Sequence, residues 1–227
     1  TLHPIFRYNS HPNFPESMRM LSEYVEVHPL RPKPRLIEKG AKALLDGGVI
    51  IYPTDSMYAL GCKLGNKSAL TRICRIRRLD ERHQFTLICG DISTIAKYAV
   101  VQNNAYHILR THTPGAYTFI LKAKHRVPRH VMYAKRKTIG IRVPDSIVAR
   151  LLIDKVAEPI LTTSLILPNT KTPIRDPAEI RSKLSGDVDL ILAAGECGSK
   201  PTSVVNLVEG MPVVEREGLG ETASFKC

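Results

Sequence analysis

The sequence lacks the cysteine and histidine patterns that mark disulfide-rich domains and metal sites. Its five cysteines are an odd number, lie far apart and form no C-x-x-C pair. The eight histidines form no H-E-x-x-H motif. These absences argue against a disulfide framework and a structural zinc site, and we expect no metal-ligating residues. Scattered reduced thiols are typical of a cytoplasmic protein.

Long apolar runs are missing as well. No stretch approaches the ~18 residues that a membrane-spanning helix needs, and the N-terminus has no continuous apolar segment of the kind found in signal peptides. We therefore expect a cytoplasmic protein without a membrane partner.

Three common motifs of nucleotide-binding and hydrolytic enzymes are absent. The chain has no G-x-G-x-x-G after a strand, no G-x-x-x-x-G-K-[ST] and no G-x-S-x-G. A Rossmann site, a P-loop and a nucleophile elbow are thus unsupported. If a nucleotide binds, another arrangement must hold it.

What the sequence does have is an excess of positive charge. The formal net charge is +12, which indicates a polyanionic partner and says little about fold. Two interpretations stay open, a shared basic surface or separate solvated faces. The cations form three clusters: Arg72, Arg75, Arg77, Arg78 and Arg82; Lys122, Lys124, Arg126 and Arg129; and Lys135, Arg136 and Lys137 with Arg142 close behind.

The apolar periodicity predicts an α/β fold, a twisted mixed β-sheet flanked by helices in a single domain. We expect an extended arm over 1–34, where prolines are frequent, the domain over 35–220, and a tail over 221–227. Expected helices span 35–46, a segment capped by Asn66 or Ser68 that runs to 79, 92–99 capped by Asp91, 104–111, 145–156 capped by Asp145, and a segment that starts at its cap Asp176. Expected strands span 49–52, 85–89, 117–122, 138–143, 160–167, 190–193, 204–208 and 213–215.

The predicted fold is organised around residues 47–61, which read GGVIIYPTDSMYALG. Val49–Tyr52 is a buried strand that ends at Pro53, because proline cannot donate to a sheet ladder. Hydroxyl and carboxylate side chains follow, and such residues settle in turns. Open α/β sheets bind ligands at the ends of strands, although an ordinary loop would give the same pattern.

The same stretch resembles a known signature. PTDSMYALG at 53–61 is similar to PTDT-x-YGLG of the YrdC superfamily, which includes the threonylcarbamoyl-AMP synthases. PGAYT at 114–118 resembles the family's PGPLT, and RVP at 142–144 matches it directly. TSVVN at 202–206 resembles STVVD, and REG at 216–218 resembles the closing R-x-G. The motifs occur in the family's order, over residues 36–218.

The resemblance implies a function and a set of site residues. In the family, threonine takes up bicarbonate as a carbamate, which attacks ATP to give threonylcarbamoyl-AMP and pyrophosphate, with Mg²⁺ on the phosphates. The matching positions imply Arg77 and Ser164 as catalytic residues. They also imply Thr118, Arg142, Ser203 and Arg216 at the nucleotide, and Thr54, Ser56 and Tyr58 at the amino acid.

Two positions depart from the synthase pattern, in which K-x-R follows the second helix and S-x-N lies on a later strand. Arg77 stands at the lysine position and Leu79 at the arginine position. Ser164 keeps the serine, but Ile166 replaces the asparagine. RIRRL followed by FTLIC is most similar to the YciO branch, which implies weak or altered synthase activity, since leucine donates no hydrogen bond.

Three functions therefore remain open from the sequence. The first is a threonylcarbamoyl-AMP synthase-like nucleotidyltransferase that uses ATP, threonine and bicarbonate. The second is a module that binds duplex RNA or tRNA through its basic surface without efficient catalysis. The third is a related adenylate-forming or carbamoyl reaction on another amine.

Overall fold

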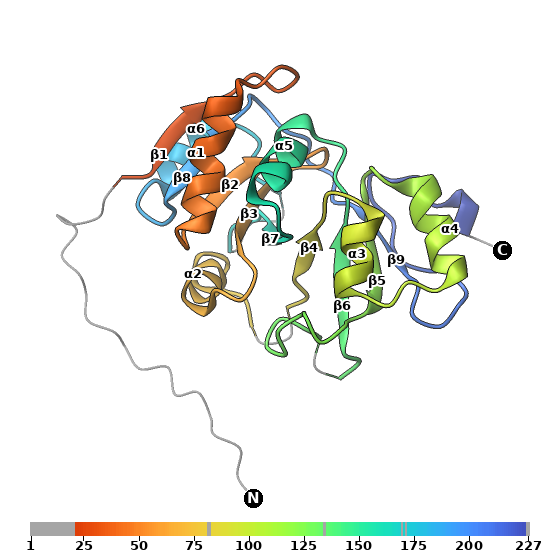
Figure 1. Ribbon diagram of the computed structural model, residues 1–227. Helices are drawn as coiled ribbons and strands as arrows, with labels where there is room; N and C mark the ends of the chain where they lie inside the picture. The colour runs from red at the N-terminus through yellow and green to blue at the C-terminus, as the bar shows by residue number, and fades with distance from the viewer. Residues whose placement is uncertain (1–20, 81–82, 134, 169, 171, 226–227) are drawn as a thin grey trace, which may run out of the picture.

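The computed structural model describes residues 21–80, 83–133, 135–168, 170 and 172–225, and shows one mixed β-sheet with helices packed on it (Figure 1). The strands are β1 (Glu23–Glu26), β2 (Val49–Pro53), β3 (Tyr58–Lys63), β4 (Thr86–Ile88), β5 (Tyr117–Lys122), β6 (Thr138–Arg142), β7 (Ile160–Ser164), β8 (Leu190–Ala193), β9 (Ser203–Asn206) and β10 (Val213–Arg216). The helices are α1 (Pro34–Leu45), α2 (Lys67–Arg77), α3 (Ile92–Tyr98), α4 (Asn103–His112), α5 (Ile147–Val156) and α6 (Pro177–Leu184), and a 3-10 turn spans Ala223–Phe225.

The sheet has ten strands in the order β1-β8-β2-β3-β7-β4-β6-β5-β9-β10. Pairs such as β2–β8, β4–β6 and β5–β9 are parallel, whereas β2–β3, β3–β7 and β5–β6 are antiparallel. The prediction of a single α/β domain built on a mixed sheet is confirmed.

The two faces of the sheet are covered unequally. One face packs on α2, α3, α4 and α6 in a core whose strand residues include Ile51, Leu87 and Ile141. The other face packs on α1 and α5, which contact each other and the neighbouring strands β2, β3 and β8. Because these two helices cover only that end of the sheet, side chains further along the same face can border a ligand.

Side-chain caps mark where α2, α3, α5 and α6 begin. Asn66 accepts a hydrogen bond from the Ala69 N–H at 3.0 Å and starts α2, as predicted. Asp91 caps α3 and Asp176 caps α6 in the same way, also as predicted. The prediction for α5 is wrong by one residue: its cap is Ser146, whose Oγ faces the Ala149 N–H at 3.4 Å, and not Asp145.

Three features of the fold were not predicted. Residues 58–63 form β3, which pairs with β2 in a hairpin. The second half of the 53–61 motif is therefore itself part of a strand. Glu23–Glu26, assigned from the sequence to the extended arm, form the edge strand β1 beside β8. Phe225, assigned to the tail, is buried in the core. Residues 1–20 of the expected arm lie outside the described residues.

The last strand contains an irregularity. Val214 pairs with Val205 and Arg216 with Val204, so Glu215 is an extra residue in β10. Such a bulge turns the side chains that follow it to the opposite face of the sheet.

Among the described residues, no helix combines the length and apolar character that crossing a membrane requires.

Replacing Asn66 should destabilise the fold at the start of α2. Asn66→Ala removes the cap and also the bond from Nδ2 to the Gly47 carbonyl at 3.1 Å. We expect a loss of about 1 kcal/mol, or roughly 2–4 °C in the melting temperature. Lys67→Ala, at the neighbouring exposed position, is the control. Equal melting temperatures for the two variants, measured by circular dichroism, would contradict the cap.

Candidate active site

A cavity of about 290 Å³ lies on the half-covered face of the sheet. Its walls come from the β2–β3 hairpin, the end of α2, the segment before β4, and strands β4, β5, β6, β7, β9 and β10. The volume is at the lower end of the range for small-molecule sites. The cavity floor is formed by alternate residues of neighbouring strands, such as Thr118, Gly140 and Thr162.

The sequence-predicted site residues converge on this cavity. Seven of the nine contribute to its lining: Thr54, Ser56, Arg77, Thr118, Arg142, Ser164 and Arg216. They come from positions 54 to 216, and three of them are arginines.

Tyr58 and Ser203 do not line the cavity. The Tyr58 hydroxyl donates to the Gly195 carbonyl at 2.7 Å and accepts from the Ala194 N–H at 3.0 Å. The Ser203 hydroxyl donates to the Gly220 carbonyl and accepts from the Gly218 N–H. Side chains alternate between the two faces of a strand, so their neighbours Ala59 and Thr202 face the cavity instead.

Arg142 forms the buried charged contact of the site. Its guanidinium donates to Asp55 and, at 3.1 Å, to the Ser56 hydroxyl, and the Arg142 and Asp55 side chains are only 8% and 13% exposed. Burial lowers the pKa of Arg142, while Asp55 opposes that effect. Arg142 Nε and Asp55 Oδ2 have no hydrogen-bond partner among the described residues. A polar ligand could satisfy such atoms, which otherwise cost free energy.

Thr54 holds the hairpin turn together. Its hydroxyl donates to the Met57 carbonyl at 2.6 Å and accepts from the N–H groups of Ser56 and Met57 at 3.2 Å. The Thr54 hydroxyl also lies 3.1 Å from the Ser56 hydroxyl, which in turn contacts Arg142. Thr54 thus positions Ser56 for Arg142, and the turn predicted from hydroxyl-rich residues is confirmed.

Arg216 is fixed at the opposite end of the cavity. Its guanidinium donates to the Thr202 carbonyl at 3.1 and 2.8 Å and to the Thr202 hydroxyl at 3.2 Å. That hydroxyl lies 2.8 Å from the hydroxyl of Thr118. Burial lowers the pKa of Arg216, as expected for a cation partly removed from water.

Arg77 joins α2 to the end of β7. Its Nη1 donates to the Ser164 carbonyl and to the Thr163 hydroxyl, the latter at 3.2 Å. The same hydroxyl lies 2.9 Å from Nε2 of His83, which also lines the cavity. Burial, with Arg77 as a second cause, lowers the pKa of His83 to about 4. The sequence analysis missed His83 because a lone histidine carries no motif. Its only signal is a polar side chain directly before a buried strand.

The two departures from the synthase pattern occupy different environments. Ile166 lines the cavity. Leu79 is instead half-buried and packs against the apolar core. An arginine at position 79 would therefore replace a packed side chain, whereas an asparagine at 166 would face the site.

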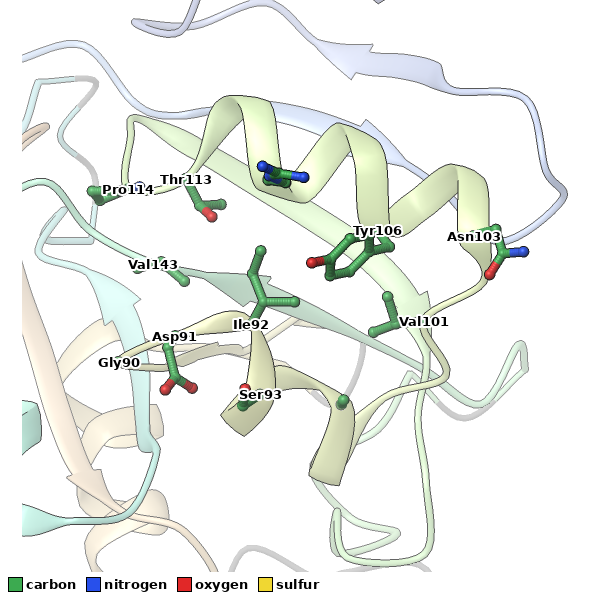
Figure 2. Close-up of a pocket in the computed structure, with 12 residues that line it drawn as sticks. Gly90, Asp91, Ile92, Ser93, Val101, Asn103, Tyr106, Thr113, Pro114 and Val143 are labelled. Carbon is green, nitrogen blue, oxygen red and sulfur yellow. The ribbon is translucent and has the colours of Figure 1, made fainter.

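A larger hollow of about 670 Å³ lies between α3 and α4, but it lacks convergent charge. Figure 2 shows Ile92, Val101 and Tyr106 lining it beside the turn at Thr113 and Pro114. Its lining contains one cation, Arg110, against the three arginines of the smaller cavity. Within the described part of the chain, no group of three or more His, Cys, Asp or Glu residues could hold a metal ion. The smaller cavity is therefore the candidate site.

The fold and site define a class: a single α/β domain with an arginine-lined cavity on a mixed sheet. The chain belongs to the Sua5/YciO/YrdC family, whose model, described as "Telomere recombination", matches residues 42–218.

The relatives include both branches expected from the sequence. YciO of Escherichia coli is 47% identical over 205 residues, covering 90% of this chain and all of that protein. The crystal structure of E. coli YciO superposes with a TM-score of 0.87, covering 91% of this chain and 100% of that chain. A threonylcarbamoyl-AMP synthase of Halorhodospira halophila is 30% identical over 175 residues, 76% of this chain and 90% of that protein. The fold is also that of P. abyssi Sua5 complexed with L-threonine, at a TM-score of 0.80 and 22% identity, over 87% of this chain and 58% of that one.

Replacing Leu79 and Ile166 one at a time with the synthase residues should show that the two positions tolerate a polar side chain differently. Leu79→Arg places a charge against the core and should cost about 1–3 kcal/mol of unfolding free energy. Ile166→Asn faces the cavity and should cost less than about 1 kcal/mol. Urea unfolding of both variants beside the wild type measures the difference. Equal stability of the two variants would show that Leu79 is not part of the core.

Proposed function

We propose that the protein is a threonylcarbamoyl-AMP synthase-like nucleotidyltransferase. The observation that carries the proposal is the convergence of Arg77, Arg142 and Arg216 on one cavity beside hydroxyl side chains. Arginines at this density suit a polyphosphate, since each guanidinium offers several fixed donors and keeps its charge.

The proposed reaction joins three substrates. The neutral threonine amine and bicarbonate form a carbamate anion with loss of water. A carbamate oxygen then attacks the α-phosphorus of ATP, the bond to the bridging oxygen breaks, and pyrophosphate leaves. Negative charge develops on the departing phosphates, so fixed cations lower the barrier.

The proposed role of each residue follows from its position at the cavity. Arg77, Arg142 and Arg216 would contact phosphate oxygens, and Thr118 and Thr202 would hold Arg216 in place. Ser56 would face the amino acid, supported by Thr54. Mg²⁺ would enter as the ATP complex, because phosphate oxygens with one or two carboxylates usually suffice for it. Asp55, whose Oδ2 has no hydrogen-bond partner among the described residues, pairs with the cavity residue Arg142 but does not itself line the cavity.

A second candidate function, RNA binding, is favoured by the connection between β5 and β6. Residues 123–137 carry five exposed cations: Arg126, Arg129, Lys135, Arg136 and Lys137. In the described part of the chain, no ion pair involves any of them. Unpaired exposed cations can contact the phosphates of duplex RNA or tRNA without a sequence code. Arg82, counted in the first basic cluster, lies outside the described residues.

The catalytic proposal predicts adenylate formation that depends on Arg216. With ATP, threonine, bicarbonate and Mg²⁺, we expect pyrophosphate release and threonylcarbamoyl-AMP in the mass spectrum. Arg216→Ala should lower the rate about 100-fold, because it removes a donor to the developing charge. Arg75→Ala, an exposed arginine of α2, is the matched control.

Three results would contradict this assignment. Loss of activity in both variants would mean that general charge, not Arg216, matters. Pyrophosphate release that does not need threonine would favour another amine substrate, and the absence of product in the wild type would leave RNA binding as the better function.

The RNA proposal predicts salt-dependent binding through the β5–β6 connection. The double variant Lys135→Glu, Arg136→Glu should bind duplex RNA at least tenfold more weakly and lower the salt slope by about one per lost contact. Lys33→Glu with Arg35→Glu makes the same charge change at two other exposed positions. Fluorescence anisotropy at several salt concentrations measures both. Equal losses in the two double variants would show that only net charge matters.

A further inference from the structure

The group formed by Arg77, Thr163 and His83 supports an inference that deepens the proposed nucleotide binding and rests on it. Thr163 Oγ1 lies 3.2 Å from Arg77 Nη1 and 2.9 Å from His83 Nε2. A hydroxyl has one hydrogen to donate and two lone pairs to accept with. Since arginine only donates, Thr163 accepts from Arg77, and its remaining bond with His83 depends on the ring's protonation.

The surroundings of His83 keep its ring neutral in the free protein. Burial is the main cause and Arg77 of α2 the second, while Asp80, in the segment after α2, acts in the opposite direction. On the other side, the ring packs edge-on against Phe85 at a centroid distance of 4.9 Å. The other charges at the cavity are Arg142, Arg216 and the Asp55 partner of Arg142. In the tautomer with its proton on Nδ1, the neutral ring accepts the Thr163 hydrogen at Nε2.

We propose that His83 is a binding residue for the polyphosphate of the nucleotide and takes up a proton from solvent as the anion enters. The proton adds to the Nε2 lone pair, so that Nε2–H donates to Thr163 Oγ1. The Thr163 hydroxyl hydrogen is then released from the ring and can turn toward a phosphate oxygen. One protonation thus adds a positive charge and a free donor to the site.

The sign of the pH dependence follows from linkage. The pKa of His83 is low in the free protein and higher in the complex, because the phosphate charge favours imidazolium. Binding therefore strengthens as the pH falls through the complex pKa toward the free pKa. Each unit of difference corresponds to about tenfold in affinity.

The test follows the His83 ring by NMR, with its signal assigned by loss in His83→Gln. ATP should raise the pKa of His83 by about one unit or more, and AMP, which lacks the polyphosphate, should raise it less. Calorimetry of ATP binding between pH 4 and 8 measures the linked affinity. For a rise of one unit, the wild type should gain about fivefold in affinity at the acidic end of this range, and His83→Gln should lack that gain. The titration of ATP itself is common to both proteins and cancels in the comparison.

His130→Gln is the matched control, because burial also lowers the pKa of this exposed histidine outside the cavity. It should keep the wild-type pH dependence. ATP binding with an unmoved His83 pKa and equal pH profiles in wild type and His83→Gln would overturn the inference alone. No ATP binding by the folded wild type would overturn the proposed function, and this inference with it.

Discussion

The strict alternation of side chains along the strands is the constraint on which the site depends. Every second residue faces the core under α2, α3, α4 and α6, and the residues between them face either α1 and α5 or the cavity. Since α1 and α5 cover only one end of their face, the other end keeps polar residues at core-like positions. The cavity lies over a part of the sheet that no helix of the described residues covers.

The same geometry partly removes three arginines from water, which costs free energy. Burial lowers the pKa of Arg77, Arg142 and Arg216 alike, yet only Arg142 has a carboxylate partner among the ion pairs of the described residues. Buried cations without counter-ions are unfavourable unless something else supplies negative charge. The desolvated cations of this site therefore favour a ligand that carries negative charge.

The sequence predicted the parts of the fold that depend on local chemistry. Proline, asparagine and aspartate set the end of β2 and the starts of α2, α3 and α6. It missed β3, because residues 58–63 contain a glycine and were read as part of a motif and not as a strand. This strand is defined by its pairing with β2 and β7. It placed Tyr58 and Ser203 in the site because motif matching cannot tell which face a side chain takes. His83 belongs to the site through tertiary contacts alone.

The bulge in β10 has a consequence for the charge at the cavity wall. Residues that pair across antiparallel strands share a face, so Arg216 lies with Val204 on the cavity side. A regular ladder over the same residues would instead pair Glu215 with Val204 and turn Arg216 to the opposite face. The bulge therefore places a cation, and not a carboxylate, at the cavity wall. The register of a short edge strand thus sets the sign of the charge at this end of the cavity.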